Sequence, residues 1–254
     1  MPHEYFLANG YVATASEPGA YWGMSEMRLR NLASREARVR QRLYFADREP
    51  VDLAERVIGP LGGPYQEFPR DLPAELGNAG PWGARIRSDA PLAFVHISLA
   101  RRNGRRQERQ FAGGCAFQLA RPQLARRWVF PDCFKMFVPP QNPPFPFSQY
   151  EWYHFLNPHP TPTRLRLTIG DDRGGRDVRE HTLGAERVWF LDDPALVRGD
   201  FGQCYLEVVS DQPILADGAR VLQSPLGPDD WGVVIGCASP PSSETDPTDP
   251  ARVP

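Results

Sequence analysis

The chain lacks the features of a membrane-bound or exported protein. It has no apolar run of about 18 residues, the length that a membrane-spanning helix needs. Its opening residues, Met1-Pro2-His3-Glu4, lack the basic and apolar regions of a signal peptide. It also has four cysteines and no CxxC motif, so we expect buried, reduced thiols rather than two disulfides. The sequence therefore predicts a cytoplasmic protein with no membrane partner.

The common catalytic and cofactor motifs are also missing. The sequence contains no GxSxG, no Walker A loop, no GxGxxG after a strand, no HExxH or HxxxH and no Cys/His cluster. We therefore expect no cofactor, no metal site built from neighbouring residues and, on balance, no enzymatic activity. The dispersed residues His3, His154, His159 and His181 leave open a metal cluster that forms only in the folded chain.

Positive charge is neither abundant nor evenly spread. The formal net charge is −2 and Lys135 is the only lysine, so the chain has no general basic field for nucleic acid. A local cluster of arginines, from Arg101 to Arg109, flanks Asn103-Gly104, a favoured hairpin turn. We expect a solvated hairpin tip there. The alternative is a scaffold or nucleic-acid-associated regulator that uses this hairpin.

The chain contains 28 prolines and 22 glycines, which interrupt it at short intervals and favour short strands over long helices. Against this background two segments recur. Ser88-Asp89-Ala90-Pro91 returns 122 positions later as Ser210-Asp211-Gln212-Pro213, and each is followed by a short apolar run. Because Asp and Pro favour turns, we predict a turn followed by a buried strand in both places.

A second recurrence lies upstream of each copy of the first. Residues 31–44 align with residues 157–170 at an offset of 126, and in both segments, the first of which continues to Phe45, alternate residues are apolar. A period of two is typical of a strand with one buried face. We therefore predict an all-β fold made of two tandem β-sandwich domains related by internal duplication, residues 1–120 and 127–238, with a barrel as the alternative. Residues 239–254 have little to bury, and we expect a disordered tail.

The order of these segments resembles the sensory rhodopsin transducer family of small bacterial β-sandwich proteins. The resemblance depends on Ala8-Asn9-Gly10-Tyr11, on Asn31-Leu32-Ala33, on residues 44–50 and on Ser88-Asp89-Ala90-Pro91 followed by Val95-His96. It implies two small-molecule-binding domains in tandem, with sugars or related metabolites as ligands and a sensing or regulatory role. Gly218 stands in the second copy where the first has His96, so a site that needs both His96 and Arg220 is split between the copies.

The predicted ligand site combines polar strand residues with aromatic side chains from a predicted flexible segment, residues 16–23. Imidazole, hydroxyl, guanidinium and carboxylate groups can orient a sugar, and aromatic faces pack on its C–H groups. Each candidate also has a purely structural interpretation: a hydrogen-bonded core histidine, aromatic packing between domains, or solvent-exposed acids. The candidates are His96, Ser98, Arg220, Tyr21, Trp22, Glu17 and Asp132.

These observations predict a non-enzymatic protein that binds a small polar metabolite, such as a sugar or a sugar acid. A carbohydrate-active enzyme with His96 as its acid/base group is the alternative, and it requires a second titratable group beside His96. The duplication also suggests self-association into a homo-oligomer.

Overall fold

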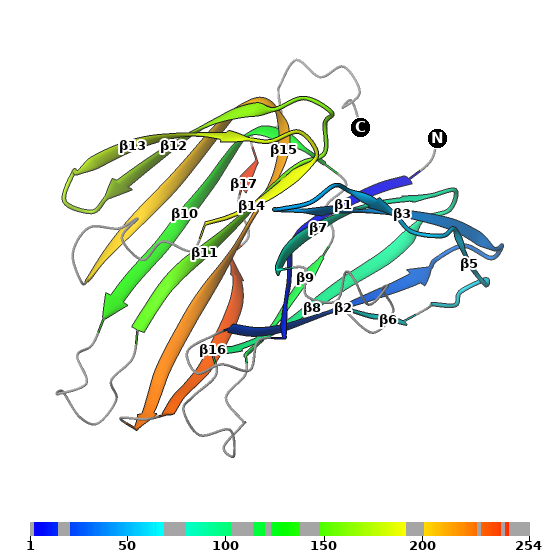
Figure 1. The fold of residues 1–254 in the computed structure, drawn as a ribbon, viewed down its shortest axis with the longest axis horizontal. Coiled ribbons are helices and arrows are strands. Elements are labelled where there is room, and N and C mark those ends of the chain that lie inside the picture. The colour runs from blue at the N-terminus through cyan, green and yellow to red at the C-terminus, as the bar shows by residue number, and fades with distance from the viewer. Residues whose placement is uncertain are drawn as a thin grey trace.

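The structure is a computed structural model that describes residues 3–14, 21–63, 65–68, 80–102, 114–119, 123–137, 148–191, 201–227, 230–239 and 242–243. Within these residues it contains seventeen strands and no helix, and pairings join the strands into one large, mixed sheet (Figure 1). The prediction of an all-β fold is confirmed. None of the described segments forms a helix long and apolar enough to cross a membrane.

We call residues 3–119 the N-terminal half and residues 125–239 the C-terminal half. The N-terminal half contains β1 (His3–Thr14), β2 (Tyr21–Asn31), β3 (Ala37–Phe45), β4 (Val51–Asp52), β5 (Arg56–Ile58), β6 (Tyr65–Phe68), β7 (Gly80–Ser88), β8 (Leu92–Arg102) and β9 (Gly114–Leu119). The C-terminal half contains β10 (Ala125–Phe137), β11 (Ser148–Asn157), β12 (Thr163–Asp171), β13 (Arg176–Leu183), β14 (Arg187–Leu191), β15 (Phe201–Gly227) and β16 (Asp230–Ser239), and β17 (Ser242–Ser243) follows it.

In the N-terminal half, β7 pairs with β1 and β3, and β2 pairs with β6 and β8. The alternation predicted for residues 37–45 is present in β3, where Val39 and Leu43 are buried and Arg38 and Arg40 are exposed. The apolar side chains of these strands form one core cluster, which includes Leu7, Leu29, Val39, Leu43, Phe45, Trp82, Ile86 and Phe94.

In the C-terminal half one long strand, β15, pairs with most of the others. Its residues 201–210 pair with β10 and β12, its residues 215–223 pair with β11, and its residues 218–227 pair with β16 on the other side. A second core cluster lies among these strands and includes Trp128, Phe130, Phe155, Leu165, Leu167, Leu206 and Val208.

The strand pairings of the N-terminal half recur in the C-terminal half in the same register. Val39 is opposite Ser88 between β3 and β7, and Leu165 is opposite Ser210 between β12 and β15. Each strand keeps one offset in all such pairings: 123 for β1, 126 for β2 and β3, 125 for β5 and β6, 122 for β7 and β8 and 121 for β9. We call residues related by these offsets equivalent.

Two irregular features also occur at equivalent positions. The β1–β7 register shifts between Leu7 and Gly10, and the β10–β15 register shifts between Phe130 and Cys133. The fully buried amides of Asn31 and Asn157 each bind a following loop: the first donates to the carbonyls of residues 35, 58 and 59, the second to those of residues 161 and 184.

The two halves contact each other through a buried surface. Phe6, Ala8 and Tyr44 of the N-terminal half belong to the core cluster of the C-terminal half, and β14 pairs with β3 through Arg187 and Phe45 (Figure 1). The Ala8 N–H donates to Asp217 Oδ2 over 3.4 Å. The Arg42 guanidinium makes two hydrogen bonds with the Glu186 carboxylate, of 3.1 and 3.2 Å.

Some local predictions need correction. Tyr21 and Trp22 were predicted to lie in a flexible segment, but their backbones belong to β2. The Ser-Asp-x-Pro turn separates β7 from β8, whereas β15 continues unbroken through its second copy at residues 210–213. Residues 204–210 of β15 pair with β12 and residues 215–223 pair with β11. Because the strand keeps its direction between these two partners, residues 210–213 stay extended. In the segment predicted to be a disordered tail, Ser242–Ser243 pair with β10, and residues 244–254 lie outside the described residues.

Candidate functional site

The backbones of four predicted site residues lie on two neighbouring strands. His96 is opposite Met27 and Ser98 is opposite Ser25 in the β2–β8 ladder. Tyr21 and Trp22 begin β2, opposite Arg102 and Arg101. The structure therefore places β8, which carries His96 and Ser98, beside β2, which carries Tyr21 and Trp22. Along β2, Tyr21 is four residues from Ser25, the residue opposite Ser98.

Arg220 belongs to a different strand of the C-terminal half. Its backbone on β15 is opposite Glu151 on one side and Cys237 on the other. The equivalent of His96, Gly218, is enclosed: a Cβ atom there would lie 2.8 Å from the Phe130 ring. The C-terminal half thus has no room for a histidine at this position.

The remaining predicted candidates are scattered. Asp132 lies in the irregular stretch of β10 between Phe130 and Cys133. Glu17 lies outside the described residues, as does the arginine hairpin beyond Arg102. Within the described part of the chain, no three His, Cys, Asp or Glu side chains are placed to hold a metal ion.

A different polar site, which the sequence analysis did not single out, lies on the outward faces of β3 and β7. Because side chains alternate along a strand, Arg38, Arg40 and Arg42 project from β3 on the face opposite to the core. Arg85 and Arg87 of β7 are directly opposite Arg42 and Arg40. We call the region lined by these five arginines the arginine groove.

The arginine groove contains two adjoining cavities of about 560 and 680 Å³. Both are lined by Arg40, Glu55 and Arg87. The larger cavity also reaches Glu186 of the C-terminal half, so it lies where the two halves meet. These volumes are in the range of small-molecule sites.

At the centre of the groove each carboxylate is shared between two arginines. Glu55 accepts from Arg40 at 2.7 Å and lies 3.5 Å from Arg38, so one carboxylate serves two guanidinium groups. Glu4 is shared in the same way by Arg85, at 2.5 Å, and Arg87, at 2.8 Å. Four arginines thus share two carboxylates, and the side chains of Arg38 and Arg40 are 70% and 77% exposed. Asp52, Glu186 and Asp89 also line the two cavities, so the described lining holds as many carboxylates as arginines.

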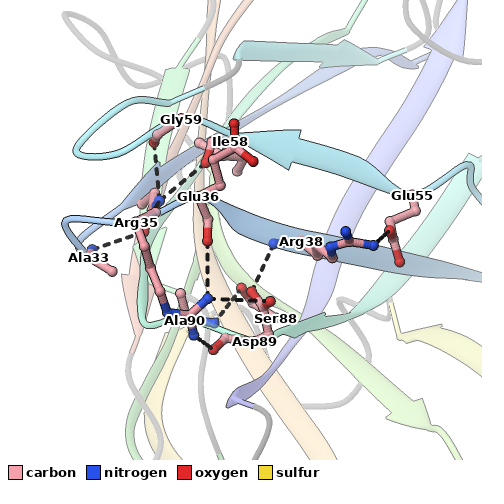
Figure 2. A network of polar contacts seen from close by, with 11 residues as sticks. Ala33, Arg35, Glu36, Arg38, Glu55, Ile58, Gly59, Ser88, Asp89 and Ala90 are labelled. Carbon is pink, nitrogen blue, oxygen red and sulfur yellow. Dashed lines mark hydrogen bonds and ion pairs between the residues drawn. The ribbon is translucent and has the colours of Figure 1, made fainter.

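One end of the groove is fixed by Asp89, in the turn between β7 and β8 (Figure 2). Its carboxylate accepts the backbone N–H of Arg38 at 2.8 Å and pairs with the Arg35 guanidinium at 3.4 Å. The Arg38 hydrogen bond and the Arg35 charge lower the pKa of Asp89. The aspartate of the predicted Ser-Asp-x-Pro turn thus stabilises the turn by binding the backbone of β3.

A second set of polar residues is buried in the C-terminal half. His154 and Asp217 are opposite each other on β11 and β15 and are each 1% exposed. The hydroxyl of Tyr153 lies 2.8 Å from the Cys133 sulfur, and Cys133 is opposite Cys204. Contact with Cys204 and burial both raise the pKa of the Cys133 thiol, so it remains protonated. Both cysteines are reduced and buried, as predicted for them.

Comparisons with known proteins give little further information. No model of a known protein family matches the chain, and no curated protein does. Among solved structures, the crystal structure of Thermotoga maritima 1070 matches with a TM-score of 0.37 and 15% sequence identity, over 47% of this chain and 92% of that chain. The similarity is one of β-rich fold and assigns no family.

Proposed function

We propose that the chain is a tandem duplication of one β-sandwich unit, of the kind found in the sensory rhodopsin transducer family, and that it binds a small acidic metabolite. The duplication is supported by the constant offsets between equivalent strands. It is further supported by the equivalent irregularities in β1 and β10 and by the equivalent loop contacts of Asn31 and Asn157.

The proposed ligand is a sugar acid, bound non-enzymatically in the arginine groove in a sensing or regulatory role. The observation that carries this proposal is the sharing of Glu4 and Glu55 among four arginines beside cavities of about 560 and 680 Å³. The planar fork of a guanidinium group matches a carboxylate in a bidentate arrangement, so a ligand carboxylate would pair with a guanidinium that shares its protein carboxylate with a second arginine.

The carboxylates of the groove favour a ligand that also carries hydroxyl groups. Glu55 and Asp52 line the larger cavity and can accept hydrogen bonds from sugar hydroxyls. A ligand in this cavity would touch Glu186 as well as β3 and β7, and so would contact both halves. Its binding could then alter how the halves pack, which is what a sensing role needs.

The test is a thermal-shift and calorimetric screen of uronic and aldonic acids against the matching neutral sugars. We expect at least one acid to bind and its neutral counterpart to bind at least about tenfold more weakly, because one charge-assisted hydrogen bond contributes about 1.5–3 kcal/mol. Arg40→Met should abolish this binding. Arg166→Met, at the equivalent position on β12, is the matched control and should leave it intact.

The predicted site around His96 is tested in the same screen. His96→Ala and Arg220→Ala should leave acid binding unchanged if the ligand occupies the arginine groove. Loss of binding in those variants, with Arg40→Met unaffected, would move the site to the β2–β8 strand pair. A panel without any binding acid would refute the proposed function.

A further inference from the structure

The C-terminal half has an outward sheet face equivalent to the one that the N-terminal half buries against it. We call this the C-terminal outer face; one row across it runs Val129–Glu207–Thr168–Val178 over β10, β15, β12 and β13, in which Thr168 is buried. Tyr205, Val209 and Val178 lie on it and are 40%, 42% and 43% exposed. In the N-terminal half the equivalent face is buried: Phe6, Ala8 and Tyr44 are at most 4% exposed because the C-terminal half covers them. Of their equivalents, Pro131 is exposed, Val129 is half-buried and Gly170 is buried.

The covering surface also has an equivalent. The C-terminal half covers Phe6, Ala8 and Tyr44 with β11, β14 and the second part of β15. The equivalent strands of the N-terminal half are β2, β6 and β8, and the equivalent residues include Arg30, Leu61, Gly63 and Val95. We call these four residues the N-terminal docking surface.

We propose that the C-terminal outer face of one copy binds the N-terminal docking surface of a second copy, head to tail, in the arrangement that the two halves already use within the chain. Such an interface is heterologous, because each copy contributes a different surface. Three contacts between the halves carry the proposal, because in each of them both partners change together at the equivalent positions.

The first contact is the ion pair between Arg42 and Glu186. Arg42 is also paired with Asp52, its neighbour across the β3–β4 ladder. The equivalents are apolar or uncharged throughout: Leu61 replaces Glu186, Thr168 replaces Arg42, and Val178 stands opposite Thr168. Leu61 is 59% exposed. In the proposed interface an apolar contact between Leu61 and Val178 takes the place of the charged one.

The second contact is the hydrogen bond from the Ala8 N–H to Asp217. The equivalent of Ala8 is Pro131, which has no N–H, and the equivalent of Asp217 is Val95, whose side chain has no acceptor. Neither the donor nor the acceptor is therefore left unpaired. A change in only one of them would leave a buried polar group without a partner.

The third contact is steric. A Cβ atom on Gly83 would lie 2.7 Å from the Leu7 carbonyl oxygen in its own half and 3.1 and 3.3 Å from Val188 and Leu156 of the other half, so a side chain there would press on both. The equivalent of Gly83 is the large Tyr205, and the equivalents of Val188 and Leu156 are Gly63 and the exposed Arg30. Large and small residues are exchanged, and Arg30 can stack on the Tyr205 ring.

The test is the molar mass of the full chain in solution, measured by light scattering across a range of concentrations. We expect a mass above that of the 28.6 kDa monomer. Leu61→Glu should weaken association at least about a hundredfold, because it buries an unpaired charge. The backbone tolerates this change, since Leu61 and Glu186 have the same positive φ, 52° and 51°.

A compensating variant makes the test specific. Leu61→Glu combined with Val178→Arg places an ion pair of the Glu186–Arg42 kind across the new interface and should restore association, since Val178 is exposed. Val57→Glu, at an equally exposed valine of β5, is the control and should not change the mass. A chain that is monomeric at all concentrations, or an oligomer that Leu61→Glu does not affect, would overturn the proposal. No ligand is involved, so this outcome is independent of sugar-acid binding.

Discussion

The two halves fill equivalent positions with different pairs of residues. In the N-terminal half Gly10 is opposite Trp82, and a Cβ atom on Gly10 would lie 2.2 Å from the indole ring. In the C-terminal half the equivalent pair is Cys133 and Cys204, two residues of intermediate size. One large and one very small residue thus occupy the place of two medium ones, and the core remains filled in both halves.

Other cross-strand pairs are exchanged outright. Tyr44 is opposite Gly83 in the N-terminal half, and Gly170 is opposite Tyr205 in the C-terminal half. The Glu4–Arg85 ion pair likewise returns as Arg127–Glu207, with the charges on opposite strands. The fold therefore constrains the combined size and charge of each cross-strand pair more than the identity of either residue.

The largest expected effect comes from breaking the most tightly packed pair. Gly10→Val should lower the free energy of unfolding by about 3 kcal/mol or more, because the Trp82 ring occupies the space of any side chain there. Cys204→Val, in the equivalent pair, should cost less than about 1.5 kcal/mol, because it changes the volume little and leaves the contact between Tyr153 and Cys133 in place. Urea denaturation of both variants gives the comparison, and equal costs would contradict it.

A smaller effect is expected at the equivalent asparagines. Asn31→Ala leaves three backbone carbonyls and the Ala33 N–H without their partner and should cost about 3 kcal/mol. Asn157→Ala removes two such carbonyl contacts and the one from the His159 N–H, so it should cost somewhat less. The same denaturation measurement applies, with the reverse order as the contrary result.

Exchanging a charged pair should have little net effect. Arg127→Glu or Glu207→Arg alone should cost up to about 1 kcal/mol, because the pair is partly exposed. The double variant, which has the polarity of Glu4 and Arg85, should recover most of this loss. A double-mutant cycle measures the coupling energy, and additive single costs would show that the pair is not a unit.

The smallest effect concerns pH. Burial lowers the pKa of His181, whose ring stacks on Trp189 with 3.7 Å between centroids. The neutral imidazole is therefore favoured in the folded chain, so its contribution is complete above the unfolded pKa of about 6.5 and is lost as the pH falls through the lowered folded value. His181→Phe should flatten this part of the stability profile between about pH 7 and pH 5; an unchanged profile would exclude His181 as its origin.

The sequence predicted strand class and position well where alternation was regular. The alternating pattern of residues 37–45 and 163–171 predicted the correct buried face. Asn31 and Asn157, which begin the two recurring segments, are buried and bind neighbouring loops. Prediction failed where short-range signals competed with long-range pairing. Ser210–Pro213 carries turn residues, yet pairing on both sides of it keeps β15 extended.

The arginine groove was not predicted because its charge sharing is formed across strands. In the sequence, Arg38, Arg40 and Arg42 are the polar positions of a strand predicted to have one buried face, a pattern that indicates exposure to solvent rather than a site. Their proximity to Arg85 and Arg87 depends on the β3–β7 register, and Glu55 and Glu4 come from elements without a recognisable motif. The signal in the sequence is that arginine occupies alternate positions in two segments, 38–42 and 85–87. If these two strands are paired, their arginines lie on the same face.

The unbroken course of β15 over 27 residues has a consequence for how the chain opens. Because β15 pairs with β10, β12, β11 and β16, none of these strands can separate from it without disturbing the other pairings. Their amide protons should therefore exchange together. In the N-terminal half the turn between β7 and β8 divides the same work between two strands. The β1–β7–β3 strands and the β2–β8 strands should therefore exchange at separate rates, each group as a small cooperative unit.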